Sequence, residues 1–365
     1  MNKKSNNSLS SEGLGEAVFG QKLISWYLQN KRDLPWRNTK NPYKIWLSEV
    51  ILQQTRVAQG LPYYENFVKH FPTVFDLAKA NEEQVLKIWQ GLGYYSRARN
   101  LHHTAQYVSE NLNGEFPKTY NELIKLKGIG SYTAAAISSF SNDENVAVLD
   151  GNVYRVLSRY FGIETDISSS QAKKEFQEMA DEVLDKKRPA LFNQAIMEFG
   201  ALQCVPKNPN CEVCVLNDSC VALQKNKVAQ LPVKLKKTKV IQRFFNYVVF
   251  SDENNNTLIN KRTQNGIWKN LYEFPLLESN EKDIPNEILN LYSKKYAVSE
   301  IIPFHEQPII HKLSHQELHI NFWRVEIKNT LENGISFDEL ENYPFPIVIY
   351  NFIRKLDAWW WKLDV

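Results

Sequence analysis

The spacing of apolar residues divides the chain into two parts with different predicted secondary structure. From about Glu16 to Leu223, apolar residues recur every three or four positions, as in FGQKLISWYLQ and EEQVLKIWQGL, with Gly, Pro and Asn between the runs. This period is typical of amphipathic helices. After Val240, short segments rich in aromatic and β-branched residues alternate with turns, and a terminal FPIVIYNFIRKL returns to helical spacing. The pattern therefore predicts an all-α domain followed by an α+β domain.

These patterns also set the expected domain boundaries. We expect a disordered N-terminus at 1–15, a helical domain at 16–224, a basic linker at 225–240 and an α+β domain at 241–365. The linker has six lysines and no acidic residue, so it is suited to lie along a phosphate backbone.

The distribution of charge favours nucleic acid as a partner. Residues 1–240 carry 31 Lys and Arg against 24 Asp and Glu, whereas residues 241–365 carry 13 against 17. A basic first part is suited to a polyanionic partner. The N-terminal MNKKSNNSLSSEGLG lacks the apolar core of a secretory signal, and no run of about 18 apolar residues could span a bilayer. We therefore expect a cytoplasmic monomer, nucleoid-associated if bacterial, with no membrane partner.

All four cysteines lie within 17 positions and predict a metal-binding loop. They are Cys204, Cys211, Cys214 and Cys220. Disulfides are disfavoured in the cytoplasm. The intervals of six, two and five residues contain one short pair, whereas structural zinc sites usually have two. The spacing therefore favours a [4Fe–4S] cluster, with zinc as the alternative, because thiolates bind both.

The stretch LKGIGSYTAAAI predicts two helices joined by a tight turn. We expect the first helix to end on Gly128 and the second to begin at Ser131 or Tyr132. Gly128 and Gly130 let the backbone approach a neighbour closely, and the free N–H groups of a helix start can hold a phosphate. The sequence thus indicates a phosphate-binding hairpin, and an ordinary αα-corner with a glycine cap is the alternative.

Two carboxylates occupy unusual positions. Glu49 lies in YKIWLSEVILQQTRV, whose apolar residues surround the predicted helix nearly completely, so its carboxylate should be buried. Such a group is either salt-bridged or has a pKa raised toward neutrality, as a general acid needs. Asp150 stands at a predicted helix start in VLDGNVYRVLSR, where helix capping is the common role. Gln53, Gln54 and Thr55 follow Glu49 on the same element and are able to hydrogen-bond in a groove.

Together these features resemble the helix-hairpin-helix DNA glycosylases with an iron–sulfur loop, and most closely the adenine-specific mismatch glycosylases of the MutY family. The resemblance covers about Glu16 to Leu223 through LPWR, SEVILQQT, GLGYYSRARNL, GIGSYTA, LDGNVYRVLSR and the cysteine loop. It implies a helix-hairpin-helix glycosylase domain with a [4Fe–4S] cluster bound by the four cysteines, followed by a Nudix-like domain. The implied reaction is hydrolysis of the N-glycosidic bond of adenine mispaired with 8-oxoguanine or guanine, after base flipping and without lyase activity.

The resemblance also implies roles for individual residues. Glu49 would protonate N7 of adenine, and Asp150 would stabilise the oxocarbenium ion or capture it covalently. The other implied contacts are Tyr132 and Asn152 beside these carboxyl groups, Arg32, Leu34, Trp36 and Arg37 in the base pocket, Gln54 and Tyr94 at the gap left by flipping, Thr55 as a further DNA contact, and Gly128 and Gly130 at a phosphate. A purely structural Trp36, and an exchange of roles between Tyr94 and Tyr95, are the alternatives.

The second domain resembles a Nudix domain through NKRTQNGIWKNLYEFPLLE at 260–278. A Nudix pyrophosphatase needs a glutamate-rich box that binds magnesium, and 241–365 contains none, so we expect recognition without hydrolysis. HKLSHQELH falls where the family senses 8-oxoguanine. There Leu313 replaces the family's phenylalanine, whereas Ser314 and His315 match it. A histidine-rich metal site is the alternative for this stretch.

Two other functions are alternatives to the adenine glycosylase activity that the resemblance implies. A bifunctional glycosylase/lyase of the endonuclease III type needs an amine near the sugar to form a Schiff base. Tyr132 occupies that family's lysine position, and Lys127 precedes the glycine turn and should point elsewhere. A non-catalytic DNA-binding or redox-sensing protein would keep its function after loss of Glu49 or Asp150.

Overall fold

The chain forms two compact units. The computed structural model describes residues 11–235, 239–280 and 284–356, with side chains from residue 18 onward. Unit 1 contains Met1–Ala78 and His103–Lys236, and unit 2 contains Lys79–His102 and Lys237–Val365. In its described residues, none of the helices has both the length and the apolar character of a membrane span.

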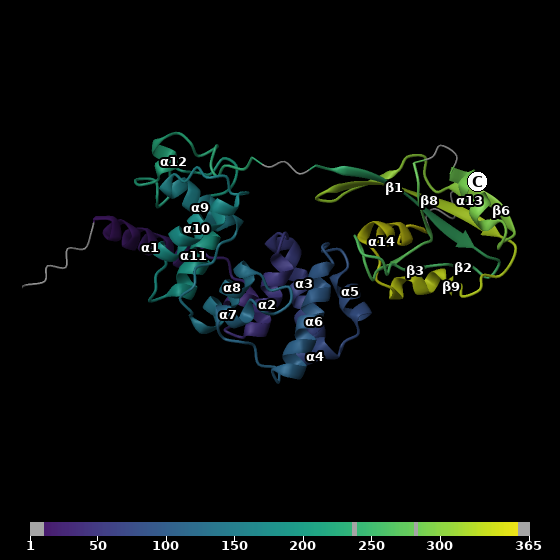
Figure 1. Ribbon diagram of the computed structural model, residues 1–365, viewed down its shortest axis with the longest axis horizontal. Helices are drawn as coiled ribbons and strands as arrows, with labels where there is room; N and C mark the ends of the chain where they lie inside the picture. Colours follow the sequence, from purple (N-terminus) through teal and green to yellow (C-terminus); the bar gives the residue numbers. More distant parts are fainter. Residues whose placement is uncertain (1–10, 236–238, 281–283, 357–365) are drawn as a thin grey trace, which may run out of the picture. The chain divides into compact units, whose positions relative to one another are not determined.

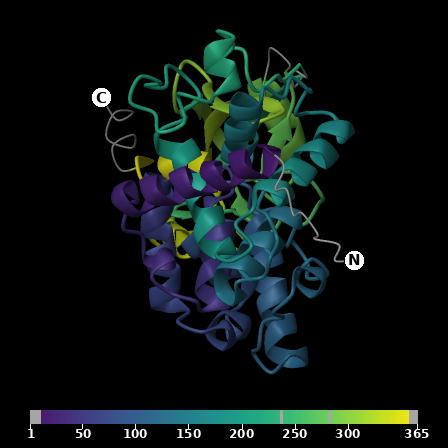
Figure 2. The same ribbon diagram turned by 90° about the vertical axis from the view of Figure 1, so that its left-hand side faces the viewer.

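Unit 1 is built from helices, as predicted. They are α1 (Ser11–Asn30), η1 (Pro35–Arg37), α2 (Pro42–Leu52), α3 (Val57–His70), α4 (Val74–Lys79), α6 (Ser96–Asn111, whose first turns belong to unit 2), α7 (Tyr120–Leu123), α8 (Ser131–Asn142), α9 (Gly151–Phe161), α10 (Ser170–Val183), α11 (Pro189–Leu202) and α12 (Val221–Gln224). Helix α11 packs on α1, α8 and α9. In Figure 2 the purple helix α1 crosses in front of teal helices of the same unit.

The start of α1 differs from the expected disorder of residues 1–15. Helix α1 begins at Ser11, whereas residues 1–10 lie outside the described residues. Phe19, Leu23 and Tyr27 are buried further along the same helix. Once packing fixes these turns, each added residue gains a backbone hydrogen bond, so the helix extends toward the N-terminus.

The predicted hairpin begins its second helix at Ser131, as expected, but its first helix ends earlier. Helix α7 ends at Leu123 and not at Gly128. After Leu123 the chain makes tighter turns, in which Leu126 N–H donates to Leu123 O at 3.0 Å. Gly128 has a φ of +78°, a conformation that favours glycine. The hairpin therefore has a long turn, and Gly130 stands at the N-terminus of α8.

Unit 2 is an α+β structure, which confirms the predicted class. Its elements are α5 (Glu82–Trp89), β1 (Ile241–Ser251), β2 (Asn256–Thr257), β3 (Asn260–Lys261), β4 (Tyr272–Glu273), β5 (Leu276–Glu278), α13 (Ile284–Tyr292), β6 (Val298–Pro303), β7 (Ile309–Lys312), β8 (Gln316–Ile327), β9 (Ile335–Ser336), η2 (Phe337–Asn342) and α14 (Ile347–Ile353). The main sheet has the order β5-β1-β8-β6, and β7 also pairs with β8. The long strands β1 and β8 run parallel (Figure 1).

Both faces of the main sheet are covered. Val248 of β1 packs with Ile284 and Ile288 of α13 on one face. On the other face, the ring of Phe322 stacks on Phe352 of α14 with centroids 3.7 Å apart. Residues 313–315 form the turn between β7 and β8. Because both strands pair in this sheet, the two ends of the turn are held in place.

The segment Lys79–His102 belongs to unit 2, unlike the predicted 16–224 boundary. Its side chains bond to C-terminal residues over long sequence separations. Arg99 Nη1 donates to Lys269 O at 2.9 Å, and the Tyr272 hydroxyl donates to Glu83 Oε1 at 2.8 Å. Helical periodicity cannot reveal such pairings, because it reports only on contacts between neighbours along one helix.

Candidate active site

A cavity of about 620 Å³ opens in unit 1, within the range of roughly 300–1,000 Å³ typical of ligand pockets. Its walls come from η1 and the residues before it, from α2, from the start of α9 and from α11. The sequence-predicted residues that line it are Arg32, Leu34, Trp36, Arg37, Glu49, Gln54, Thr55, Tyr132, Asp150 and Asn152. The fold thus brings together most of the expected site from segments far apart in the sequence.

Glu49 is buried on α2, with 6% of its surface exposed. The Tyr132 hydroxyl donates to Glu49 Oε2 at 2.5 Å. Burial raises the pKa of Glu49 to about 7, and the hydrogen bond from Tyr132 partly opposes that rise. The structure therefore gives Glu49 the raised pKa that was one of its two expected states, and a proton near neutral pH.

Asp150 caps the N-terminus of α9 and also lines the pocket. Its Oδ1 accepts the N–H groups of Asn152 at 2.9 Å and Val153 at 2.8 Å, and its Oδ2 accepts the Asn152 amide at 2.7 Å. Burial raises the pKa of Asp150, while these hydrogen bonds and the charge of Arg155 favour the ionised form. The capping role and a place in the site are therefore combined in one residue.

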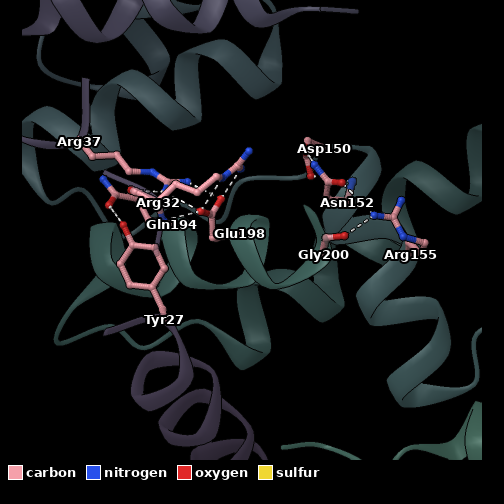
Figure 3. Close-up of polar contacts among 9 residues, drawn as sticks. All are labelled: Tyr27, Arg32, Arg37, Asp150, Asn152, Arg155, Gln194, Glu198 and Gly200. Carbon is pink, nitrogen blue, oxygen red and sulfur yellow. Dashed lines mark hydrogen bonds and ion pairs between the residues drawn. The ribbon is translucent and has the colours of Figure 1, made fainter. Parts of the chain in front are cut away.

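Arg155 holds Asn152 in place from one turn further along α9. Its Nη2 donates to Asn152 Oδ1 at 2.8 Å and to Gly200 O at 2.6 Å (Figure 3). Its Nε donates to Cys204 O at 2.7 Å. A single side chain thus connects the Asp150 cap, helix α11 and the start of the cysteine loop.

Glu198 is not among the residues predicted from the sequence, and it lies on α11 with 1% of its side chain exposed. Arg32 and Arg37 each donate two side-chain hydrogen bonds to its carboxylate, at 2.5 to 2.9 Å (Figure 3). Burial alone would raise the pKa of Glu198, but the arginines lower it to about 2. Glu198 therefore stays ionised and fixes both arginines. A lone glutamate in the apolar run LFNQAIMEFG was the available signal.

Gln53, Gln54 and Thr55 lie in a turn after α2 and not on the helix as expected. Helix α2 ends at Leu52, and Thr55 N–H donates to Leu52 O at 3.1 Å. Gln54 has a φ of +57°, which is uncommon for a residue with a side chain. The left-handed turn ends the helix here and leaves both Gln54 and Thr55 in the pocket wall.

Trp36 combines its two expected roles. It is buried and its ring packs edge-on against Tyr64, with centroids 5.0 Å apart. It also lines the pocket with Leu34. The same indole therefore belongs to the core and provides an apolar wall for a ligand.

Four other predicted residues lie in unit 2. Tyr94 is 51% exposed, whereas Tyr95 is buried, so Tyr94 is the ring available to a ligand. The Tyr94 hydroxyl hydrogen-bonds the Ser314 hydroxyl. Ser314 and His315 are exposed and Leu313 is half-buried, in the turn between β7 and β8. The predicted wedge and the predicted sensing loop are therefore in direct contact.

The four cysteines of the loop 204–220 line one cavity of unit 1, together with Arg159. Arg159 Nη1 donates to Cys204 Sγ at 3.4 Å, so a cation lies beside the sulfur ligands and offsets thiolate charge. Within the described residues, no group of three or more His, Cys, Asp or Glu is arranged to hold a single metal ion such as zinc. Four sulfurs around a shared cavity fit a cluster, in which each thiolate binds a different iron.

Family models match three parts of the chain. The HhH-GPD superfamily base excision DNA repair protein model matches residues 47–182, the iron–sulfur binding domain of endonuclease III matches 204–220, and the NUDIX domain matches 246–355. The second match decides between a cluster and zinc, and the chain carries a [4Fe–4S] cluster, as predicted. The third confirms the Nudix-like character of unit 2.

Solved structures and relatives with similar sequences agree with these family matches. A thermostable thymine-DNA glycosylase is 27% identical, with a TM-score of 0.55, over 59% of this chain and 100% of that one. The fold and the pocket define a helix-hairpin-helix DNA glycosylase. Adenine DNA glycosylase of Buchnera aphidicola subsp. Schizaphis graminum is 35% identical over 88% of this chain and 93% of its own length, and the human one is 43% identical over 59% and 41%. The chain belongs to the adenine DNA glycosylase family.

Proposed function

We propose that this adenine DNA glycosylase removes adenine opposite 8-oxoguanine or guanine in double-stranded DNA, as a monofunctional enzyme and a monomer. The observation that carries the proposal is a pair of buried carboxyl groups with different hydrogen-bond partners in one pocket. Burial raises the pKa of Glu49 to about 7 and also raises that of Asp150, but Asp150 accepts three hydrogen bonds that favour its ionised form. Such a pair is suited to cleavage through an oxocarbenium-like transition state.

Glu49 acts as the general acid. Its Oε2 accepts the Tyr132 hydroxyl, which leaves Oε1 to carry the proton toward N7 of the flipped adenine. Protonation makes the base a better leaving group, because the electrons of the broken N-glycosidic bond then reside on a neutral base. Asp150 stabilises the positive charge on the sugar or captures it covalently, and water supplies the hydroxyl that completes hydrolysis.

The pocket holds the base between apolar and cationic walls. Leu34 and Trp36 contact its faces, and Arg32 and Arg37 present donors whose direction is set by Glu198. The adenine reaches this pocket only after it leaves the base stack. Gln54 and Thr55 line the pocket, and Gln54 fills the gap left in the duplex. Tyr94 of unit 2 is 51% exposed and offers a ring that stacks on DNA bases.

Hydrolysis without lyase chemistry is favoured by the placement of the amines. Tyr132 lines the pocket beside Glu49, whereas Lys127 lines a separate groove with Lys118 and Lys125. A Schiff base requires an amine near the sugar. Gly128 and Gly130 hold a DNA phosphate at the start of α8, where free backbone N–H groups favour an anion.

Unit 2 recognises the base opposite adenine and does not hydrolyse nucleotides. Ser314 and His315 are exposed in the β7–β8 turn and can hydrogen-bond the edge of 8-oxoguanine. The contact between the Tyr94 and Ser314 hydroxyls supports joint action of these residues at the mispair. Leu313 contributes an apolar contact without aromatic stacking.

Cys204, Cys211, Cys214 and Cys220 are the ligands of the cluster in this proposal. The cluster supplies a covalent staple for the loop when bound, while Arg159 holds the loop through Cys204 Sγ and the carbonyls of Val205 and Pro206. The enzyme works in the cytoplasm, associated with the nucleoid if the source is bacterial.

One assay tests the proposal. Single-turnover excision is measured on duplexes that differ only in the base opposite adenine: 8-oxoguanine, guanine, cytosine or thymine. We expect rapid excision opposite 8-oxoguanine and guanine, negligible excision opposite thymine, and no strong borohydride trapping. Equal rates opposite all four bases would contradict the mispair specificity, and covalent trapping at the level of a lyase would contradict the monofunctional mechanism.

A further inference from the structure

The segment Val146–Val148 leads to Asp150 and belongs to no helix or strand. Val146 N–H donates to the carbonyl of Glu144, whereas Ala147 N–H and Val148 N–H donate to side chains. Unpaired backbone groups are costly when buried, and Ala147 and Val148 are buried. The side chains that satisfy this segment come from α10 and α11.

Asn193 of α11 makes the shorter contacts. Its Oδ1 accepts Val148 N–H at 3.1 Å, and its Nδ2 donates to Val146 O at 2.9 Å and to Ser139 Oγ at 2.9 Å. Asn193 is 1% exposed. Only a side chain with both a donor and an acceptor can bond N–H and C=O of one segment in this way. Asn193 thus holds the segment through both kinds of backbone group.

Two residues of α10 support the middle of the segment through longer contacts. Asp181 Oδ1 accepts Ala147 N–H at 3.3 Å, and Gln177 Nε2 donates to Ala147 O at 3.4 Å. Gln177 is half-buried and Asp181 is exposed. The buried Asn193 amide is therefore the stronger restraint on the backbone that precedes Asp150.

We propose that Asn193 is a positioning residue for the Asp150 carboxylate, acting through the backbone of Val146–Val148. Only Leu149 separates Val148 from Asp150, so a shift of Val148 moves the carboxylate relative to the sugar. Helix α11 also carries Glu198 and the Gly200 carbonyl that accepts Arg155. One helix thereby sets the position of Asp150 and of the groups around it. The inference rests on the proposed role of Asp150.

The test compares Asn193→Ala with Phe192→Leu, a neighbouring buried core variant that does not bond to the segment. We expect Asn193→Ala to lower the single-turnover excision rate roughly 10- to 100-fold, because small misplacements of a catalytic group have effects of this size. The Kd for the mispair should change less than threefold. Phe192→Leu should lower the Tm by about as much as Asn193→Ala does, but it should keep the wild-type excision rate.

A pH profile separates positioning from stability alone. Looser hydrogen bonding would raise the pKa of Asp150, so the acid limb of the rate should move to higher pH in Asn193→Ala and not in Phe192→Leu. If Asn193→Ala does not fold, Asn193→Ser and Ser139→Ala carry the same comparison with smaller rate losses. A wild-type rate and an unmoved acid limb in folded Asn193 variants would overturn the inference. Asp150→Asn is measured alongside: if it stays active, the proposed role of Asp150 fails first.

Discussion

The pocket has two walls that bury the same type of side chain in different surroundings. The Glu49 wall consists of α2 and the Tyr132 hydroxyl, and there burial raises the glutamate pKa to about 7. The Glu198 wall consists of α11 with Arg32 and Arg37, which overcome burial and lower the glutamate pKa to about 2. Neighbouring charges, and not residue type or burial alone, decide which glutamate carries a proton and which serves as a fixed anion.

The largest expected effect tests the Glu49 wall. Glu49→Gln keeps the size of the side chain and removes its proton donation, so we expect single-turnover excision to fall by roughly 10²- to 10⁴-fold. Asp150→Asn should be comparably inactive. Binding to the mispair should remain, because phosphate contacts supply most of the affinity. Near-normal excision by either variant would show that its carboxyl group has no role in the chemistry.

The same substitution on the other wall should affect stability first. Glu198→Gln leaves Arg32 and Arg37 without their carboxylate, and we expect a loss of about 2–3 kcal/mol, below the usual 3–5 for a fully buried pair because Arg32 is partly exposed. Thermal unfolding at pH 8 measures this change. Glu49→Gln should be neutral or stabilising at that pH, since it removes a buried group that would otherwise ionise. If both variants lowered the Tm equally, the two glutamates would not differ in their contribution to stability.

Stability should also depend on pH with opposite signs for the two glutamates. The pKa of Glu198 is lowered, so its contribution is present above about pH 4.5 and is lost as pH falls toward 2. The pKa of Glu49 is raised, so its contribution is full below about pH 4.5 and is lost as pH rises through 7. The free energy of unfolding, measured with denaturant, should therefore decline less from about pH 4.5 to 7 in Glu49→Gln than in wild type. An identical decline in both proteins would contradict the raised pKa of Glu49.

The pH dependence of excision sharpens the comparison on the Glu49 side. The acid form of Glu49 is needed, so the rate should fall as pH rises through about 7. Tyr132→Phe removes a hydrogen bond that lowers the pKa of Glu49, and the falling limb should move to higher pH. Single-turnover rates between pH 5 and 9 measure the falling limb in wild type and in Tyr132→Phe. A limb that moves to lower pH in Tyr132→Phe would contradict this role of the hydroxyl.

The smallest effects should come from the β7–β8 turn of unit 2, where Ser314 and His315 are exposed. The ratio of excision opposite 8-oxoguanine to excision opposite guanine is the measurement. Ser314→Ala combined with His315→Ala should lose most of that ratio, since each contact provides roughly 1–3 kcal/mol of discrimination. Leu313→Phe should keep or modestly raise it by stacking. An unchanged ratio in the double variant would exclude the loop from recognition.

The sequence by itself determined the features that depend on local spacing. It divided the chain into a helical and an α+β part, placed the cysteine loop and the start of α8, and singled out Glu49 and Asp150, which line one pocket. Its errors fell at element ends, where α7 stops at Leu123 and α2 stops before Gln53. Turns decide such ends, and their hydrogen bonds lie outside the helical period.

Only the tertiary structure decided which distant groups meet. Glu198 pairs with Arg32 across 166 positions, and Asn193 bonds Val148 across 45. The same applies to the segment Lys79–His102, which belongs with the C-terminal residues. Periodicity shows that a glutamate or asparagine will be buried, because burial follows from the apolar residues around it. Which partner then satisfies the buried group depends on how the helices pack, and that packing sets the pKa of each carboxyl group in the pocket.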